Sequence, residues 1–198
     1  MPTVLQRIQQ QLQQTGLTER TEASRQWLLS LMPSLKVTPA TILKDRAAFK
    51  NRALIGRMYF FRYTAAGRDD LPYYDRFPLT IPIDHYPDGF LGLNLHYLPP
   101  KIRLILLNKL SELSSTPGRY DERTRLRISY KILVGHARLY EHTPAIKRYL
   151  FTQVRSRFVE VGASQWDIAA MLPTASFVGA SISEVHADSR KKIDERNS

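Results

Sequence analysis

The sequence contains no cysteine, which excludes disulfide bonds and metal sites built from thiolates. No apolar run approaches the roughly 20 residues of a membrane span, and the first residues lack the apolar core of a signal peptide. We therefore expect a soluble protein that is made in a cytoplasm and has no membrane partner. The 198 residues are 43% hydrophobic, which suffices for one core, so we expect one domain with appended ends.

Signatures of catalysis are also missing. The sequence has no P-loop, nucleophile elbow or triad pattern, and its five histidines lack the spacing of a zinc enzyme. His136 and Arg138 lack the His-x-x-Arg spacing of a tyrosine recombinase. Asp69, Asp70 and Asp75 are better explained by a loop of solvated carboxylates than by a metal site. We therefore expect no enzymatic activity, no catalytic residue, no cofactor and no metal.

Positive charge is abundant and unevenly distributed. The formal net charge is +11. Residues 101–157 hold 13 Lys and Arg against 4 Asp and Glu, whereas residues 1–100 hold 12 against 8 and residues 158–198 hold 4 against 6. Such a concentration suits a phosphate backbone or an acidic protein partner. The alternative is a solvated face that only keeps the protein soluble.

Two helices are predicted to carry this charge. On a helix over about 121–139, four basic residues fall within roughly a quarter of the circumference. A further helix is predicted to begin at Thr143, as N-cap, and Pro144, and to present two arginines on one face. We call the six residues the basic ridge and predict that it binds nucleic acid or an acidic partner: Arg123, Arg127, Lys131, Arg138, Arg148 and Arg155.

Residues 56–98 have the pattern of a compact β-unit. Short apolar runs at 58–63 and 79–83 precede a segment, 91–97, in which Leu and Tyr alternate with Gly, Asn and His. Pro87-Asp88-Gly89 is a turn, since proline fixes φ and glycine accepts a positive φ. We predict an α+β fold in which a small antiparallel β-meander or SH3-like half-barrel is enclosed by α-helices.

The first 50 residues are predicted to form a helical arm. Val4, Leu5, Ile8 and Leu12 make one apolar stripe opposite glutamines, and Gly16 ends this helix. A short amphipathic helix is unstable alone and must dock, either on the protein's own core or as an interface with a neighbouring subunit. A second helix ends before Pro33, and a helix through residues 44–52 leads into the β-unit.

An aromatic run at 73–77 has two interpretations. Tyr73, Tyr74 and Phe77 suit a protein interface, where such residues are enriched, and exposed tyrosines also suit base stacking. The alternative is structural: a tyrosine caps the β-unit while Arg76 pairs with Asp75 or Asp84.

The remaining third of the chain is predicted to be mainly helical. We expect helices over 101–172, interrupted by an extended piece at 158–161, with Ser164 capping the last helix at 165–172. Residues 166–189 faintly resemble a helix-turn-helix but lack residues that read bases. The predicted organisation is an arm at 1–50, an α+β core at 51–175 and a tail at 176–198 that frays or docks on a partner.

Residues 50–175 also carry a series of aromatic-rich motifs: MYFFRY, LPYYDRFPLTIPI, DGFLGLNLHYLPP, RLRISYKIL, KRYLF and WDIAAMLP. The series resembles a small family of virion proteins in T4-like tailed phages, whose members are DNA end protectors or tail and baseplate components. The resemblance implies a non-enzymatic virion protein that binds by shape and charge. Its partner is then double-stranded DNA ends or, alternatively, neighbouring tail, neck or baseplate subunits.

Overall fold

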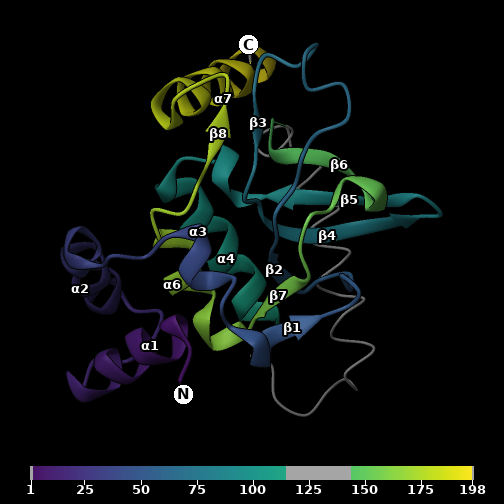
Figure 1. Ribbon diagram of the computed structural model, residues 1–198. Coiled ribbons are helices and arrows are strands. Elements are labelled where there is room, and N and C mark those ends of the chain that lie inside the picture. Colours follow the sequence, from purple (N-terminus) through teal and green to yellow (C-terminus); the bar gives the residue numbers. More distant parts are fainter. Residues whose placement is uncertain (1, 115–143, 198) are drawn as a thin grey trace.

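The structure, a computed structural model, describes residues 2–114 and 144–197 (Figure 1). The first half contains α1 (Val4–Gln14), α2 (Glu22–Leu31), η1 (Met32–Ser34), α3 (Pro39–Ile42), η2 (Arg46–Ala48), β1 (Phe49–Lys50), β2 (Met58–Phe60), β3 (Tyr74–Asp75), β4 (Leu79–Tyr86), β5 (Gly89–Asn94) and η3 (Leu95–Tyr97). The second half contains α4 (Pro100–Ser114), β6 (Ile146–Leu150), η5 (Phe151–Gln153), β7 (Phe158–Val161), η6 (Ala163–Gln165), α6 (Trp166–Met171), β8 (Phe177–Val178) and α7 (Ile182–Asn197).

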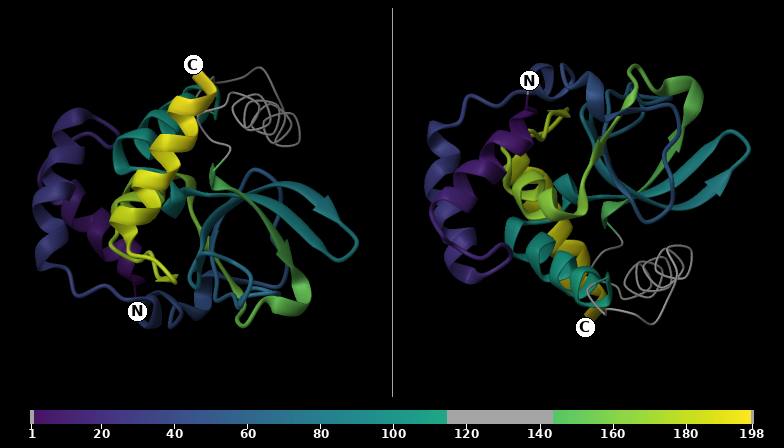
Figure 2. Two further views of the ribbon diagram at one scale, coloured as in Figure 1. Left: turned by 90° about the horizontal axis from the view of Figure 1, so that it is seen from above. Right: turned by 90° about the horizontal axis from the view of Figure 1, so that it is seen from below.

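An antiparallel sheet of six strands organises the molecule, in the order β1-β7-β2-β4-β5-β6. The predicted meander is its centre, because β2, β4 and β5 are consecutive neighbours. The sheet has two ends, β1 and β6, and is therefore open. Helices α1, α2, α4 and α6 gather on one side, whereas the β4–β5 hairpin projects away from them (Figure 2). The predicted α+β class is confirmed.

Close packing of β4, β5 and β6 requires glycine at two positions of β5. A Cβ on Gly89 would lie 1.9 Å from the carbonyl oxygen of Tyr149, and a Cβ on Gly92 would lie 2.3 Å from Cγ2 of Thr80. The predicted turn is present at Pro87-Asp88, but Gly89 already belongs to β5 and does not take the positive φ expected of it. Gly89 thus allows the close approach of β6, and Gly92 leaves room for the Thr80 side chain of β4.

The segment from Leu91 to Tyr97 is buried more completely than its alternating pattern predicted. Leu93 and Leu95 are buried as expected, but Asn94 and His96 are buried too. The reason is that both faces of the sheet are covered. The main core lies against the helices, and a second, aromatic cluster lies apart from it and contains Ala53, Tyr59, Phe61, Tyr63, Ala65, Phe90, Tyr149 and Phe158.

The amino-terminal helix packs on the protein's own core. A capping box between Thr3 and Gln6 begins α1, and Gly16, with φ of 73°, follows its end. Leu5 and Ile8 join the main cluster, and the side-chain amide of Gln165 donates to Gln9 at 3.0 Å. The apolar stripe of α1 therefore docks on the protein's own core rather than on a neighbouring subunit.

Two predicted helices are absent. The segment 44–52 does not form the predicted helix: it contains only the short 3-10 helix η2, and Phe49–Lys50 pairs with β7 as strand β1. The segment after Pro144 is strand β6 rather than a helix, because its backbone completes the hydrogen bonds of β5. In both cases pairing with a distant strand overrides the local pattern.

The carboxyl-terminal segment is also more ordered than predicted. Residues 182–197 form α7, in which Val185, Ser189 and Ile193 are buried, so this segment packs on the protein rather than fraying. Strand β8 separates α6 from α7, which excludes a helix-turn-helix there. The helix predicted over 165–172 is confirmed as α6, but Ser164 makes no capping bond. The division of the chain at residues 50 and 175 stays a prediction.

Within residues 2–114 and 144–197, no helix is long and apolar enough to cross a membrane.

Candidate nucleic-acid interface

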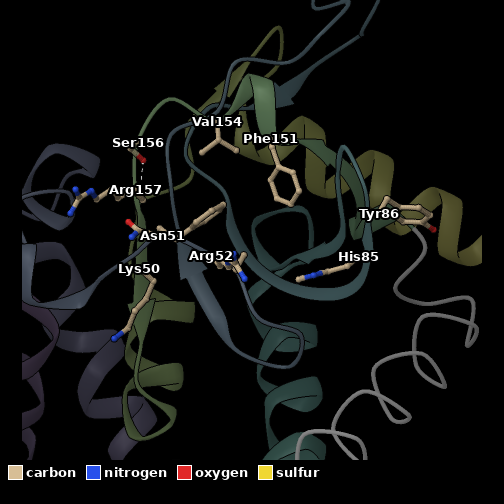
Figure 3. Close-up of a pocket in the computed structure, with 11 residues that line it drawn as sticks. Lys50, Asn51, Arg52, His85, Tyr86, Phe151, Val154, Ser156 and Arg157 are labelled. Carbon is tan, nitrogen blue, oxygen red and sulfur yellow. Dashed lines mark hydrogen bonds between the residues drawn. The ribbon is translucent and has the colours of Figure 1, made fainter.

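A cavity of about 600 Å³ opens where three distant segments meet (Figure 3). Four of its eleven lining residues are basic by residue type, and none is acidic. We call it the cationic groove and define it by its lining: Lys50, Asn51, Arg52, Ala53, His85, Tyr86, Phe151, Val154, Ser156, Arg157 and Phe158. Phe151 points into the space on one side, and Arg52 and His85 lie on the other (Figure 3).

Buried anchors hold the groove's backbone in place. Ala53 and Phe158 belong to the aromatic cluster beneath it, and the amide of Leu54 donates to the hydroxyl of Tyr59 at 3.1 Å. Ser156 Oγ accepts from the amide of Arg62 at 2.8 Å and donates to the carbonyl of Arg157 at 2.9 Å. The loops that present the basic residues are therefore fixed by packing and hydrogen bonds.

Two of the groove's cations have no counter-charge in the part of the chain that the structure describes. The guanidinium groups of Arg52 and Arg157 are exposed and make no hydrogen bond or ion pair there. Lys50 lies 3.7 Å from Glu160, which Arg57 also contacts at 2.8 Å. The groove therefore holds uncompensated positive charge that attracts anions.

The described members of the basic ridge lie beside this groove. Arg148, on β6, pairs with Asp88 and lies over the ring of Tyr86, 4.1 Å from its centroid. Arg155 donates to Thr152 O and Gln153 Oε1, at 3.1 Å each. The prediction that these two arginines share a helical face is wrong, because they occupy a strand and a loop. The other four members, Arg123, Arg127, Lys131 and Arg138, lie outside the described residues.

The model of the family described as Phage T4 terminal DNA protecting protein matches residues 4–190. The chain belongs to this family. No curated protein and no solved structure matches this chain. The family match extends beyond the 50–175 range of the aromatic motifs and includes α1, α2 and most of α7. The arm and the carboxyl-terminal helix are thus part of what this chain shares with the terminal DNA protecting family.

The residues predicted to form a protein interface lie in different environments. Phe77 is 1% exposed and stacks on Phe60 with centroids 5.2 Å apart, so it offers a partner no surface. Tyr73 donates its hydroxyl to Asp188 and Tyr74 lies on β3, and both line a second cavity of about 340 Å³. Leu5, Ile8 and Leu12 are buried, and Val4 is partly buried against the core, so this stripe too has little surface to offer.

Tyrosines line much of the second cavity, together with Lys147, Arg148 and the buried Asp75. The ammonium group of Lys147 lies 4.2 Å from the ring centroid of Tyr97. Burial lowers the pKa of Lys147 to about 8, with the nearby Lys192 acting in the same direction. Burial and the bond to Asp188 raise the pKa of Tyr73. The cavity is smaller and more apolar than the cationic groove, so it is the weaker site for a phosphate.

A buried histidine–aspartate pair lies beneath the sheet. His96 Nδ1 donates to Asp75 Oδ2 at 2.7 Å, and Asp75 also accepts from Phe77 N, Ser176 N and Asn94 Nδ2. Burial opposes ionisation of Asp75, but these donors outweigh it and lower its pKa. Burial lowers the pKa of His96, which leaves the ring neutral. Both side chains are buried, and their bond joins two segments of the fold, while Asp75 also borders the second cavity.

The structural interpretation of the aromatic run included an ion pair of Arg76. Arg76 bonds Ser176 at 3.3 Å, while Asp75 bonds His96 and Asp84 accepts from His85 N, so the expected pairing of Arg76 with Asp75 or Asp84 is wrong. Among residues 2–114 and 144–197, no three His, Asp or Glu side chains are placed to hold a metal ion.

Sequence reasoning missed the residues that form the groove. Lys50, Arg52, His85 and Arg157 come from three segments that no local pattern connects. The excess of positive charge in residues 101–157 did point to a region that contains one of them, Arg157. The excess indicated an anionic partner but not the place where it binds.

Proposed function

We propose that this protein is a non-enzymatic component of a phage virion that binds the ends of linear double-stranded DNA. The observation that carries the proposal is the cationic groove, in which Arg52 and Arg157 are exposed and uncompensated within the described chain. The family's description, a terminal DNA protecting protein, supports DNA as the anion.

The mechanism follows from the chemistry of phosphate recognition. Guanidinium groups donate paired hydrogen bonds that match phosphate oxygens. Contacts of this kind release counterions and do not read base sequence. Arg148 and Arg155 beside the groove, together with Arg123, Arg127, Lys131 and Arg138, would extend the contact along the duplex backbone. Binding is then independent of sequence and weakens as salt rises.

Preference for ends distinguishes this function from the general attraction of a basic protein to DNA. A plasmid is offered to the protein as a linear duplex and as a covalently closed circle of the same sequence, and binding is measured by gel shift in competition. We expect the linear form to bind more tightly. Equal binding of both forms would overturn end recognition. No binding to either at low salt would leave an acidic tail, neck or baseplate protein as the partner.

A charge-reversal pair localises the contact. Arg52→Glu with Arg157→Glu should abolish the preference for linear DNA. Lys36→Glu with Arg190→Glu is the matched control, because it makes the same change in net charge at two exposed positions outside the groove. The control should bind as the unmodified protein does, and equal loss in both variants would show that net charge alone is responsible.

A further inference from the structure

The cationic groove contains an exposed aromatic ring that phosphate binding does not explain. Phe151 is 43% exposed, and its ring lies 6.1 Å, centroid to centroid, from the buried ring of Phe90. One side of the ring is thus supported by the aromatic cluster while the rest faces the groove (Figure 3). A supported ring beside arginines has the composition of a platform for a nucleobase.

The size of the groove limits what can enter it. A volume of about 600 Å³ lies in the range of sites that bury a small molecule or a nucleotide. A base-paired duplex presents its phosphates and groove edges outward and keeps the faces of its bases stacked. At a blunt end only the last base pair exposes an outer face, and that face is two bases wide. An unpaired nucleotide exposes the face of a single base, which a cavity of this size can accept.

We infer that the cationic groove holds the unpaired terminal nucleotides of a single-stranded DNA end. The base stacks on Phe151, and the flanking phosphates bind Arg52 and Arg157. This inference rests on the proposed function, since it names the form of DNA end that the protein takes.

Other lining residues suit the same ligand. Asn51 carries an amide that both donates and accepts hydrogen bonds, as the edge of an unpaired base requires. Tyr86 is also exposed, and the guanidinium of Arg148 lies over its ring at 4.1 Å. This ring gives the groove a second aromatic surface, at the hairpin side, for a neighbouring base.

The test compares DNA ends that differ only in an overhang. Fluorescence anisotropy is measured with one labelled duplex, made blunt, with a short 3′ overhang or with a short 5′ overhang. We expect at least one overhang to bind more tightly than the blunt end. Phe151→Ala should weaken binding of that overhang by about 10-fold or more, while affinity for the blunt duplex stays unchanged.

Two further variants control the result. Phe151→Tyr keeps a ring in place and should retain the preference for the overhang. Ile182→Ala removes an apolar side chain of similar exposure, 42%, on α7 and should change nothing. Equal binding of blunt and overhanging duplexes by the unmodified protein would overturn the inference. So would an equal loss for all ends in Phe151→Ala.

Failure of this inference differs from failure of the proposed function. A protein that prefers linear DNA to closed circles but ignores overhangs binds ends without holding an unpaired nucleotide. A protein that does not distinguish linear from circular DNA binds no ends at all, and both proposals then fail.

Discussion

His96 Nδ1 lies 2.7 Å from Asp75 Oδ2, and the two side chains are 0% and 1% exposed. The pair joins η3 to β3, and His96 Nε2 reaches Thr174 at 3.3 Å. A neutral ring that donates through Nδ1 and accepts through Nε2 satisfies both contacts. Burial of the ring favours this neutral form over the protonated one.

Acid should destabilise the protein through this network. Burial lowers the pKa values of His96 and His186 below the usual 6.5. Below about pH 6.5 the unfolded chain therefore binds more protons than the folded chain, so stability is present above that pH and is lost as pH falls. Asp75, whose pKa is also lowered, adds a further loss of stability at more acidic pH.

Thermal melts across this pH range check the prediction. The melting temperature should fall as pH drops below about 6.5. His96→Gln should make the pH dependence shallower at a cost in stability. A flat profile for the unmodified protein from neutral pH to about pH 5 would contradict the assigned neutral state.

The buried ion pair between α2 and α6 should matter more than surface pairs. Arg25 Nε lies 2.9 Å from Asp167 Oδ2, with both side chains 10% exposed. Asp167→Ala leaves the buried guanidinium without its charge partner and should cost about 3–5 kcal/mol in a urea melt. Glu195→Ala, which breaks the exposed pair with Lys191, should cost less than about 1 kcal/mol. Similar small losses in both variants would show that α2 does not depend on the pair.

Substitution of Gly89 should disrupt the edge of the sheet. The new Cβ would lie 1.9 Å from Tyr149 O, a backbone atom that moves only if β6 moves. We expect Gly89→Ala to cost about 1–3 kcal/mol or more in a urea melt. Gly162→Ala is the control, since its Cβ would meet nothing closer than 3.7 Å. Tolerance of Gly89→Ala would mean that β6 is not held as closely as described.

Single substitutions in the groove should change the salt dependence of DNA binding. If Arg52 and Arg157 each bind one phosphate, each replacement by Ala should reduce the slope of log K against log salt by about one unit. The reduction should be alike for DNA of any sequence. Lys36→Ala should leave the slope as it is. Unchanged slopes for both arginine variants would remove the groove from the DNA contact.

The parts of the fold set by local chemistry could be predicted from the sequence. The turn at Pro87-Asp88-Gly89 and the apolar runs around it predicted the meander, and the stripe of α1 predicted an amphipathic helix. Strand β6 was missed because its sequence, Ile-Lys-Arg-Tyr-Leu, follows a good helix start at Thr143-Pro144. Only pairing with β5, a tertiary contact, makes it a strand.

The site was less predictable than the fold. Arg52 follows β1, His85 lies near the end of β4 and Arg157 precedes β7, and these three segments meet only after the sheet forms. Arg148 and Arg155 were selected because their spacing would place them on one face of a helix. That helix does not form, yet both residues lie beside the groove. Their placement there reflects the excess of charge in residues 101–157 rather than the periodicity used to find them.

Protection from nucleases distinguishes a protein bound at DNA ends from one bound along the whole duplex. Linear duplex DNA is incubated with the protein and then treated either with an exonuclease that degrades from the ends or with an endonuclease that cuts at internal sites. We predict that the protein blocks the exonuclease and leaves internal cutting unchanged, and that Arg52→Glu with Arg157→Glu removes this protection. Equal protection from both nucleases, or none from the exonuclease at saturating protein, would contradict the account.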